Sequence, residues 1–314
     1  PLGLRLGRLE DAREELLESR RALREEASDR EKDGDAAGAE HYRWQAETLL
    51  DGADSLKEQI RQAGTAAGRM ELRRMEDTML WTAQNLMGTY HSLEAEQAAA
   101  SARAEAQKHL SEKVKDQEML GSSTSYHSQE AYQKWQSALN EYGRLKKEQE
   151  RVRQELLLLT GFSPDSPVVL EKMPLPDVSR AALVNPQEDR QQALGNNYEL
   201  RSGRMGNAGS NQELHKKQRQ TELDENQMFA SLETLGDQIR SCQTEWEAAC
   251  AKEQAQRAVW QSAVRKRELG TMAEGEYLEI YSQYMEEKGN QAQASIRFLL
   301  AMEEYDWAKK GLMD

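Results

Sequence analysis

The apolar residues between positions 70 and 119 alternate in steps of three and four. This is the heptad spacing of a helix that packs against a partner helix. A second heptad pattern covers positions 126–160, after a Gly- and Ser-rich turn at 121–125. Two such helices joined by a short turn predict an antiparallel hairpin over 70–160. The first seam comprises Leu72, Met75, Met79, Thr82, Leu86, Thr89 and Leu93, and the second Ala131, Trp135, Ala138, Tyr142, Leu145, Gln149, Val152 and Leu156.

The same plan recurs in the second half of the chain. A long helix is predicted over 211–269, a turn at 270–275 and a last helix over 276–310, which together form a hairpin over 211–310. Leu-Gly ends both long helices, and Gly121 and Gly270 lie 149 positions apart. We therefore predict an internal duplication. The seams of the second hairpin comprise Met228, Leu232, Leu235, Ile239, Cys242, Trp246, Ala249, Trp260 and Val264, then Leu278, Tyr281, Met285, Ala292, Leu299 and Met302.

Prolines divide the chain between these hairpins. Apart from Pro1, all of them lie within 164–186. Because proline ends helices, an extended connector is expected at 164–187, between a first repeat at 1–163 and a second at 188–314. Within the connector, residues 168–170 are expected either to form a short strand or to lie in a groove. Further helices are predicted at 5–32, 39–63 (with Gly52 as a candidate kink) and 188–202, with breaks at 33–38, 64–68 and 203–210.

The composition agrees with an all-α fold built from long paired helices. Charged residues make up 31% of the chain and apolar residues only 38%, too few for one large spherical core. Full disorder fits poorly, because six Trp and ten Tyr recur at helical spacings. The net charge of −13 argues against a general nucleic-acid binder. The longest apolar run, Leu156–Leu159, is far below the roughly 20 residues of a membrane helix, so no membrane span is expected.

No pattern of residues indicates catalysis or metal binding. The five histidines are scattered, and none pairs with another at ligand spacing. Cys242 and Cys250 are too far apart on one helix to form a disulfide. No carboxylate pair, nucleophile arrangement or phosphate-binding loop stands out. The stripe of Ile239, Trp246 and Trp260 is best explained as seam packing. We expect neither enzymatic activity nor a cofactor nor a metal site.

The two hairpin tips share one spacing of residues: Gly121 and Thr124 in the first, Gly270 and Ala273 in the second. This spacing is similar to that of the hairpin tips of the TolC-like outer-membrane efflux proteins. Members of that family carry a Gly, a small residue three positions later, an acidic residue six positions later and then an apolar pair. The second tip matches this pattern well, whereas the first has a histidine at the acidic position and Ser128-Gln129 at the apolar pair. The residues at these positions are Gly121, Thr124 and His127 in the first tip, and Gly270, Ala273, Glu276, Tyr277 and Leu278 in the second.

Three further segments resemble this family. Residues 156–164 (LLLLTGFSP) resemble its Leu-rich helix end followed by Gly and Pro, and residues 173–177 (MPLPD) resemble its inter-repeat connector. Residues 192–201 (QALGNNYELR) resemble the Ala-Leu-x-x-Asn-x-Glu-Leu opening of a repeat. Together with the tips, the resemblance spans about residues 70–312. Each motif is weak alone, and their order and spacing carry the resemblance.

The chain departs from the family at one point. Family members place membrane strands between the first and second long helices of each repeat. Residues 64–68 and 203–210 occupy those places here, and a barrel strand needs about nine to eleven residues. The resemblance therefore implies a TolC-like helical barrel protomer without a membrane β-barrel. It is either a natural relative or a form from which the strands were removed. The chain starts at Pro1 without a signal sequence, as expected of a mature or trimmed form.

The resemblance implies a conduit component of an efflux or export system in the cell envelope, periplasmic or otherwise extracytoplasmic. Such a protein is expected to form a homo-oligomer, a trimer in this family, whose helices make a tube. Its tips would dock an adaptor (membrane fusion) protein that leads to an inner-membrane pump, with the apolar pair of the second tip exposed. The alternative is a structural or scaffolding coiled-coil protein without a conduit.

Overall fold

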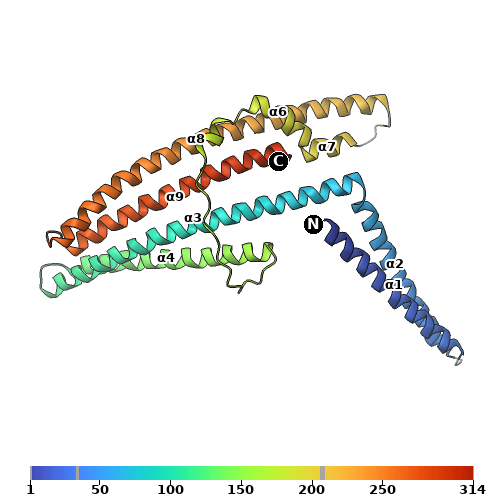
Figure 1. Ribbon diagram of the computed structural model, residues 1–314. Coiled ribbons are helices and arrows are strands. Elements are labelled where there is room, and N and C mark those ends of the chain that lie inside the picture. The colour runs from blue at the N-terminus through green and yellow to red at the C-terminus, as the bar shows by residue number, and fades with distance from the viewer. Residues whose placement is uncertain (1, 33–34, 206–208, 314) are drawn as a thin grey trace. The chain divides into compact units, whose positions relative to one another are not determined.

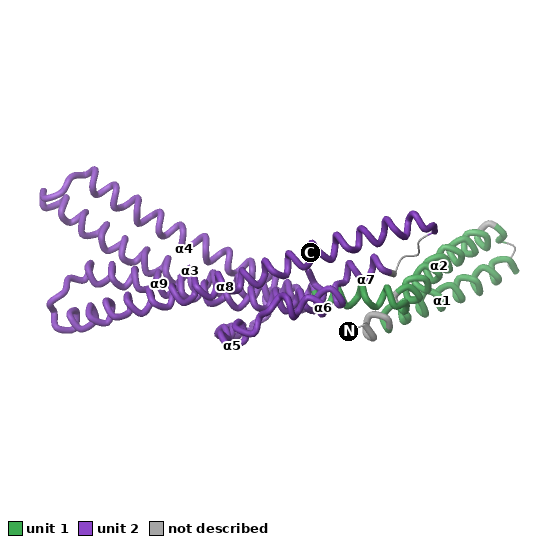
Figure 2. The backbone as a smooth tube through the Cα atoms, turned by 90° about the horizontal axis from the view of Figure 1, so that it is seen from above, with its two compact units in different colours: residues 1–77 green, residues 78–314 purple. Residues whose placement is uncertain are grey.

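The computed structural model describes residues 2–32, 35–205 and 209–313, and these are helical almost throughout, with no strand among them. The predicted all-α fold is confirmed. The predicted breaks at 33–38 and 203–210 fall partly on residues 33–34 and 206–208, which lie outside the described ranges. The described residues separate into two compact units, 1–77 and 78–314 (Figure 2). Figure 1 labels the helices.

The first unit is built around a hairpin of two helices, α1 (Leu2–Lys32) and α2 (Ala36–Ala63). Alanines of both helices are buried between them, which lets the two backbones approach closely. Asp35 begins α2 by accepting a hydrogen bond from the Gly38 amide at 3.0 Å, which satisfies one free amide of the first turn. Helix α2 runs through Gly52 without interruption. The buried alanines are Ala27, Ala39, Ala46 and Ala53.

The break after α2 is shorter than the predicted 64–68. Only Gly64 and Thr65 separate α2 from helix α3 (Ala66–Met119), which continues into the second unit. The Thr65 hydroxyl accepts a hydrogen bond from the Gly68 amide at 3.0 Å and so caps the new helix. A capping threonine lets the helix start before Gly68, so glycine spacing alone overestimates the break.

In the second unit four long helices lie side by side in the order α4, α3, α9, α8 (Figures 1 and 2). Helices α3 and α4 (Ser125–Leu159) form the first hairpin, and α8 (Asn211–Glu268) and α9 (Glu274–Lys310) form the second. Both predicted hairpins are confirmed. Helices α3 and α9 touch along their length: Gln293 bonds Glu96 at 2.8 Å, and Arg103 pairs with Glu286 at 2.9 Å.

The predicted seams are confirmed in three of the four helices. Along α4 the buried residues recur every seven positions, at Ala131, Ala138, Leu145 and Val152. In α3 the predicted register is wrong, because Met79, Thr82 and Thr89 are exposed whereas Gly88 and His91 are buried. Helix α3 has neighbours on two sides, α4 and α9. Its buried face therefore contains small and polar residues that the heptad rule does not select.

The connector is less extended than predicted. Residues 178–182 form a short helix, α5 (Val178–Ala182), and α6 (Pro186–Asn196) starts at the last proline. Proline is well tolerated in the first helical turn, where its missing amide would have no partner. Residues 168–170 form no strand. The helix predicted at 188–202 is instead two helices, α6 and α7 (Tyr198–Met205), separated at Asn197. The Asn197 side chain accepts a hydrogen bond from the Leu200 amide at 2.9 Å, which begins the second helix.

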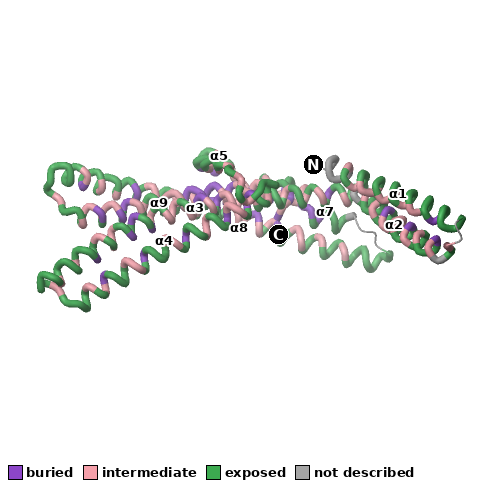
Figure 3. Tube along the Cα trace, turned by 90° about the horizontal axis from the view of Figure 1, so that it is seen from below, coloured by how far each residue is buried: buried purple, intermediate pink, exposed green. Residues whose placement is uncertain are grey.

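Burial in the second unit is concentrated at the base of the second hairpin, away from the tips (Figure 3). There α6 and α7 pack against α8 and α9. Phe298 and Leu232 are almost fully buried, and the Tyr305 hydroxyl donates a hydrogen bond to Asp189 at 2.8 Å. Burial and this hydrogen bond raise the pKa of Tyr305 far above its usual range. The base is the hydrophobic core from which both helices of the second hairpin extend.

Candidate functional site

The two hairpin tips lie at the same end of the second unit (Figure 1). At the first tip, Gly121 has φ +73°, a left-handed conformation in which glycine is favoured. Its amide bonds the Glu118 carbonyl at 2.9 Å, and the Ser122 amide bonds the Gln117 carbonyl at 2.8 Å. This pair of bonds is a Schellman motif, which ends α3 cleanly. Thr124 then begins α4 by accepting a hydrogen bond from the His127 amide at 3.4 Å.

The second tip repeats this geometry. Gly270 has φ +69°, and its amide bonds Arg267 at 2.9 Å. The Thr271 amide bonds Lys266 at 2.9 Å. The Thr271 hydroxyl donates to the same Lys266 carbonyl at 3.0 Å, as the Ser122 hydroxyl does to Gln117 at the first tip. Ala273 stands where Thr124 caps the other hairpin, and α9 therefore has no side-chain cap.

The tips display a different set of apolar residues from the one predicted. Gly121, Thr124, His127, Gly270, Ala273 and Glu276 are exposed, but Leu278 is only 8% exposed and Tyr277 is partly covered. The Arg267 guanidinium lies over the Tyr277 ring, 4.2 Å from its centroid. The expectation that Leu278 is exposed is wrong, because one helical turn into α9 its side chain already belongs to the buried face of the hairpin.

Two leucines that the family pattern does not include are the most exposed apolar side chains of the tip turns. Leu120 is 82% exposed and Leu269 is 76% exposed. Each immediately precedes the left-handed glycine, at the point where the helix ends and its side chain has no helical neighbour beyond it. The repeated Leu-Gly pair in the sequence was the signal for them. Met119 and Tyr126, each 71% exposed, enlarge the apolar surface of the first tip.

Charged residues beside the tips form local ion pairs. Lys134 pairs with Glu130 at 2.8 Å, and this hydrogen bond lowers the pKa of Glu130. At the second tip Arg267 pairs with Glu274 at 2.8 Å across the turn. All four side chains are at least 43% exposed, so solvent screens both pairs. The tips therefore present leucines among solvated charges, which is a surface suited to contact with another protein.

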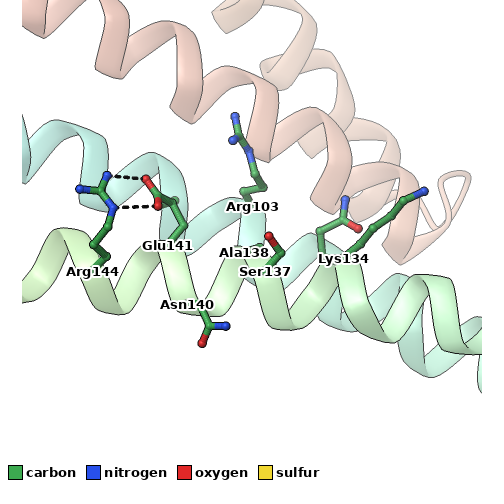
Figure 4. A pocket seen from close by; sticks show the side chains of 9 residues that line it. Arg103, Lys134, Ser137, Ala138, Asn140, Glu141 and Arg144 are labelled. Atoms are coloured by element: carbon green, nitrogen blue, oxygen red, sulfur yellow. Dashed lines mark hydrogen bonds and ion pairs between the residues drawn. The ribbon is translucent and has the colours of Figure 1, made fainter.

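A groove of about 700 Å³ lies along the first hairpin, between α3 and α4 (Figure 4). Arg103, Lys134 and Arg144 contribute cations to it, and Glu141 contributes a carboxylate. Arg144 binds Glu141 at 2.7 Å, and this contact lowers the pKa of Glu141. The groove is open, and each of these charged side chains already forms an ion pair. Among the residues that the structure describes, no cluster of His, Cys, Asp or Glu has the arrangement of a metal site.

No protein-family model and no curated protein matches the sequence. Solved structures do match the fold. A structure of the outer-membrane channel OprN superposes with a TM-score of 0.53 at 14% identity, over 84% of this chain and 72% of OprN. A structure of CusC, from work on its folding and transmembrane channel formation, matches with a TM-score of 0.56 at 14% identity. That match covers 97% of this chain and 96% of the CusC chain.

Both solved structures come from channel proteins rather than enzymes. None of the described helices is long and apolar enough to cross a membrane. The fold of this chain matches these channels over most of its length. The matched part includes the two long hairpins and the proline-bearing connector between them. The chain has a TolC-like fold, which it shares with these outer-membrane channels, and its described residues build this fold from helices without a strand.

Proposed function

We propose that this chain is one protomer of a helical conduit in an efflux or export system of the cell envelope. The observation that carries the proposal is the single row of helices α4, α3, α9 and α8 (Figure 1). A helix in the wall of a tube touches two neighbours and faces water on both remaining sides, so it needs narrow seams and abundant charge. The heptad burial of α4 and the 31% of charged residues meet these needs. This role requires no catalytic group.

The same proposal treats the chain as two tandem repeats, 1–163 and 188–314, joined by the connector at 164–187. The described glycines with positive φ support this division. They form two pairs, Gly121 with Gly270 and Gly161 with Gly311, which lie 149 and 150 positions apart. Each of the four ends a helix with the same two backbone hydrogen bonds. One ancestral hairpin, ended twice by glycine, explains both the spacing and the geometry.

Closing a tube requires the two outer helices of the row, α4 and α8, to find partners in other copies. Both display apolar side chains: Tyr132 and Leu139 of α4 are 51% and 41% exposed, and Val259 of α8 is 48% exposed. Pairing α4 of one copy with α8 of the next is a head-to-tail contact, which forms a ring when the rotation between copies closes. Three copies, the number that the family resemblance implies, would place six hairpins in the wall.

A solution-mass measurement tests the conduit against a scaffolding role. We expect a mass of three times the 35.8 kDa of one chain. Replacing both Tyr132 and Leu139 with glutamate should shift the equilibrium to monomer, because buried charges at the contact lack partners. Val169→Glu is the matched control, since Val169 is 86% exposed and lies in the connector. A parent chain that stays monomeric at the highest attainable concentration contradicts the conduit and favours the scaffold.

The hairpin tips are proposed to dock an adaptor protein that connects the conduit to an inner-membrane pump. The exposed tip residues Gly121, Thr124, His127, Gly270, Ala273 and Glu276 would contribute polar and close backbone contacts. Leu120 and Leu269 would supply the apolar contact, with Tyr277 beside them. Leu278 would act indirectly, by fixing the start of α9 from inside the hairpin. Two tips of matching backbone geometry suit a partner that presents the same motif more than once.

Aspartate at both leucines should weaken adaptor binding by at least about tenfold. Burying one leucine contributes roughly 1.5–3 kcal/mol, and about 1.4 kcal/mol corresponds to a tenfold change in affinity. The measurement is isothermal titration calorimetry of Leu120→Asp/Leu269→Asp with the helical hairpin domain of the cognate adaptor. Leu183→Asp serves as the control, because Leu183 is 82% exposed but lies beside α5. Equal affinities for the parent and the double variant would remove the tips from the docking surface.

A further inference from the structure

The hydrophobic core of the second unit belongs to the second hairpin and the helices beside it. Phe298 and Leu232 lie at its centre, and α5, α6 and α7 contribute Ala181, Ala193 and Leu200. No described residue of α3 or α4 is a member of this cluster. The first hairpin must therefore be held against the second by other contacts.

The seam between α3 and α9 combines small residues with a few large apolar side chains. Leu300 and Ile296 of α9 lie against Gly88 of α3, where a Cβ would be 2.7 and 3.2 Å from their side chains. Gly289 lies against the Ala95 carbonyl: a Cβ at Gly289 would be 3.3 Å from that oxygen. The ion pair of Arg103 and Glu286 crosses the seam, but its side chains are 52% and 49% exposed. An exposed pair of this kind contributes little in water. Between Ala95 and Arg103 the seam consists of small residues and polar contacts, so the relative position of the helices depends on the contacts from Gly88 toward the base.

The connector crosses this seam and is bound on both sides of it. Figure 1 shows it leaving the end of α4 and passing over α3 and α9. On the side of the first hairpin, Arg153 donates hydrogen bonds to the carbonyls of Ser166 and Val168 at 2.7 and 3.2 Å. His91 of α3 is 9% exposed, and its Nε2 bonds the Glu171 carbonyl at 2.8 Å. The connector is thus fastened to α4 and α3 before it reaches α9.

On the side of the second hairpin the connector ends in a polar cluster. Arg180 of α5 pairs with Glu303 at 2.8 Å and also with Asp306, both on α9. Glu303 accepts a further hydrogen bond, at 3.3 Å, from the Gln84 amide of α3. The Trp307 indole donates to the other end of Gln84 at 2.6 Å. The Arg180 and Glu303 side chains are 37% and 24% exposed, so solvent screens their pair less than the pair on the open seam.

We propose that the connector is a latch, and that the cluster of Arg180, Glu303, Gln84 and Trp307 fixes the position of the first hairpin on the second. Arg180 approaches from the connector and Gln84 from α3, and both meet on Glu303 of α9. Loss of Arg180 leaves Glu303 with only its weaker amide contact. The first hairpin then moves along α9 while the core of the second hairpin stays intact. Arg180 is a positioning residue that acts on the separation of α4 and α8.

Pulsed electron paramagnetic resonance on the full chain tests the latch. Cys242 and Cys250 are replaced by alanine, and spin labels are placed on exposed Gln133 of α4 and exposed Gln261 of α8. Excess unlabelled chain removes distances between copies. The parent should give one narrow distance distribution. In Arg180→Gln the population outside that distribution should rise about tenfold or more, because charge-assisted hydrogen bonds are lost.

The matched control is Arg144→Gln. Arg144 forms its hydrogen-bonded ion pair within its own helix, with Glu141, and is 62% exposed. The Arg144→Gln variant should leave the distance distribution narrow. Arg180→Lys keeps a cation beside Glu303 and Asp306 and should stay close to the parent distribution. An unchanged distribution in folded Arg180→Gln overturns the latch, and so does equal broadening in the control. If Arg180→Gln does not fold, Glu303→Gln replaces it. An unchanged narrow distance distribution in Glu303→Gln also overturns the latch.

Discussion

Replacing Gly311 with alanine is expected to weaken the packing of α6 and α7 against the base of the second hairpin. Gly311 ends α9 with φ +109°, which side chains rarely adopt. A Cβ there would lie 2.2 Å from the Asn196 carbonyl oxygen and 2.7 Å from its carbon. This oxygen is backbone at the junction of α6 and α7 and cannot rotate away. Backbone strain and overpacking together should destabilise the base by about 2–5 kcal/mol.

Hydrogen exchange of residues 186–205 measures this effect, because α6 and α7 are the segments that must move. The duplication supplies the control. Gly161 ends α4 with φ +83°, but nothing lies within 4 Å of the position of its Cβ. Gly161→Ala should therefore carry only the backbone strain, about 1–2 kcal/mol. If the amides of α6 and α7 are as well protected in both variants as in the parent, the junction around Gly311 is looser than its packing indicates.

Replacing Phe298 with alanine should lower the free energy of unfolding by a similar amount, for a different reason. Phe298 is fully buried in the core, with its ring centroid 5.7 Å from that of Trp246. Truncation removes the buried ring and leaves a cavity, which typically costs about 3–5 kcal/mol. The neighbouring Leu299 and Met302 belong to the same cluster and lose contacts with it. We expect a lower urea midpoint and faster amide exchange in α8 and α9.

Phe162 provides the matched control for this change. It is the same residue type, 51% exposed after the end of α4. Phe162→Ala should change the free energy of unfolding by less than about 0.5 kcal/mol, as substitutions at exposed sites usually do. The latch adds a further contrast: because the core does not include the first hairpin, Phe298→Ala should leave amide exchange in α4 close to that of the parent. Equal destabilisation by the two phenylalanine variants would show that the core is not centred at the base.

The long helices and their turns could be predicted because local residues determine them. Left-handed glycine follows leucine at both tips, and backbone strain selects glycine there in any sequence context. Capping was recognised less well: Thr65 and Pro186 begin helices inside segments that were predicted as breaks or connector. The registers of α4, α8 and α9 followed from heptad spacing. Helices α4 and α8 are the outer helices of the row, and α9, although it lies between α3 and α8, buries large apolar residues at predicted positions such as Leu278, Leu299 and Met302.

The sequence predicted where the candidate site lies along the chain, but not which of its side chains are exposed. The Leu-Gly repeat located both tips, but the family pattern selected Leu278, which is buried, and omitted Leu120 and Leu269. Exposure depends on where the helix ends relative to its partner, and one residue of shift turns a side chain by about 100°. The pattern was therefore informative about position and uninformative about orientation.

The sequence by itself determined the all-helical fold, the two hairpins and the turns between them, because heptad spacing, proline and glycine act over a few residues. Only the tertiary structure decided that α3 packs on two sides, that α6 and α7 cover the second hairpin and that the connector binds α3, α4 and α9. The contacts of Gln84 with Trp307 and of Arg180 with Glu303 join residues more than 100 positions apart. No local spacing encodes such pairs, since they depend on which helices become neighbours after the chain has folded.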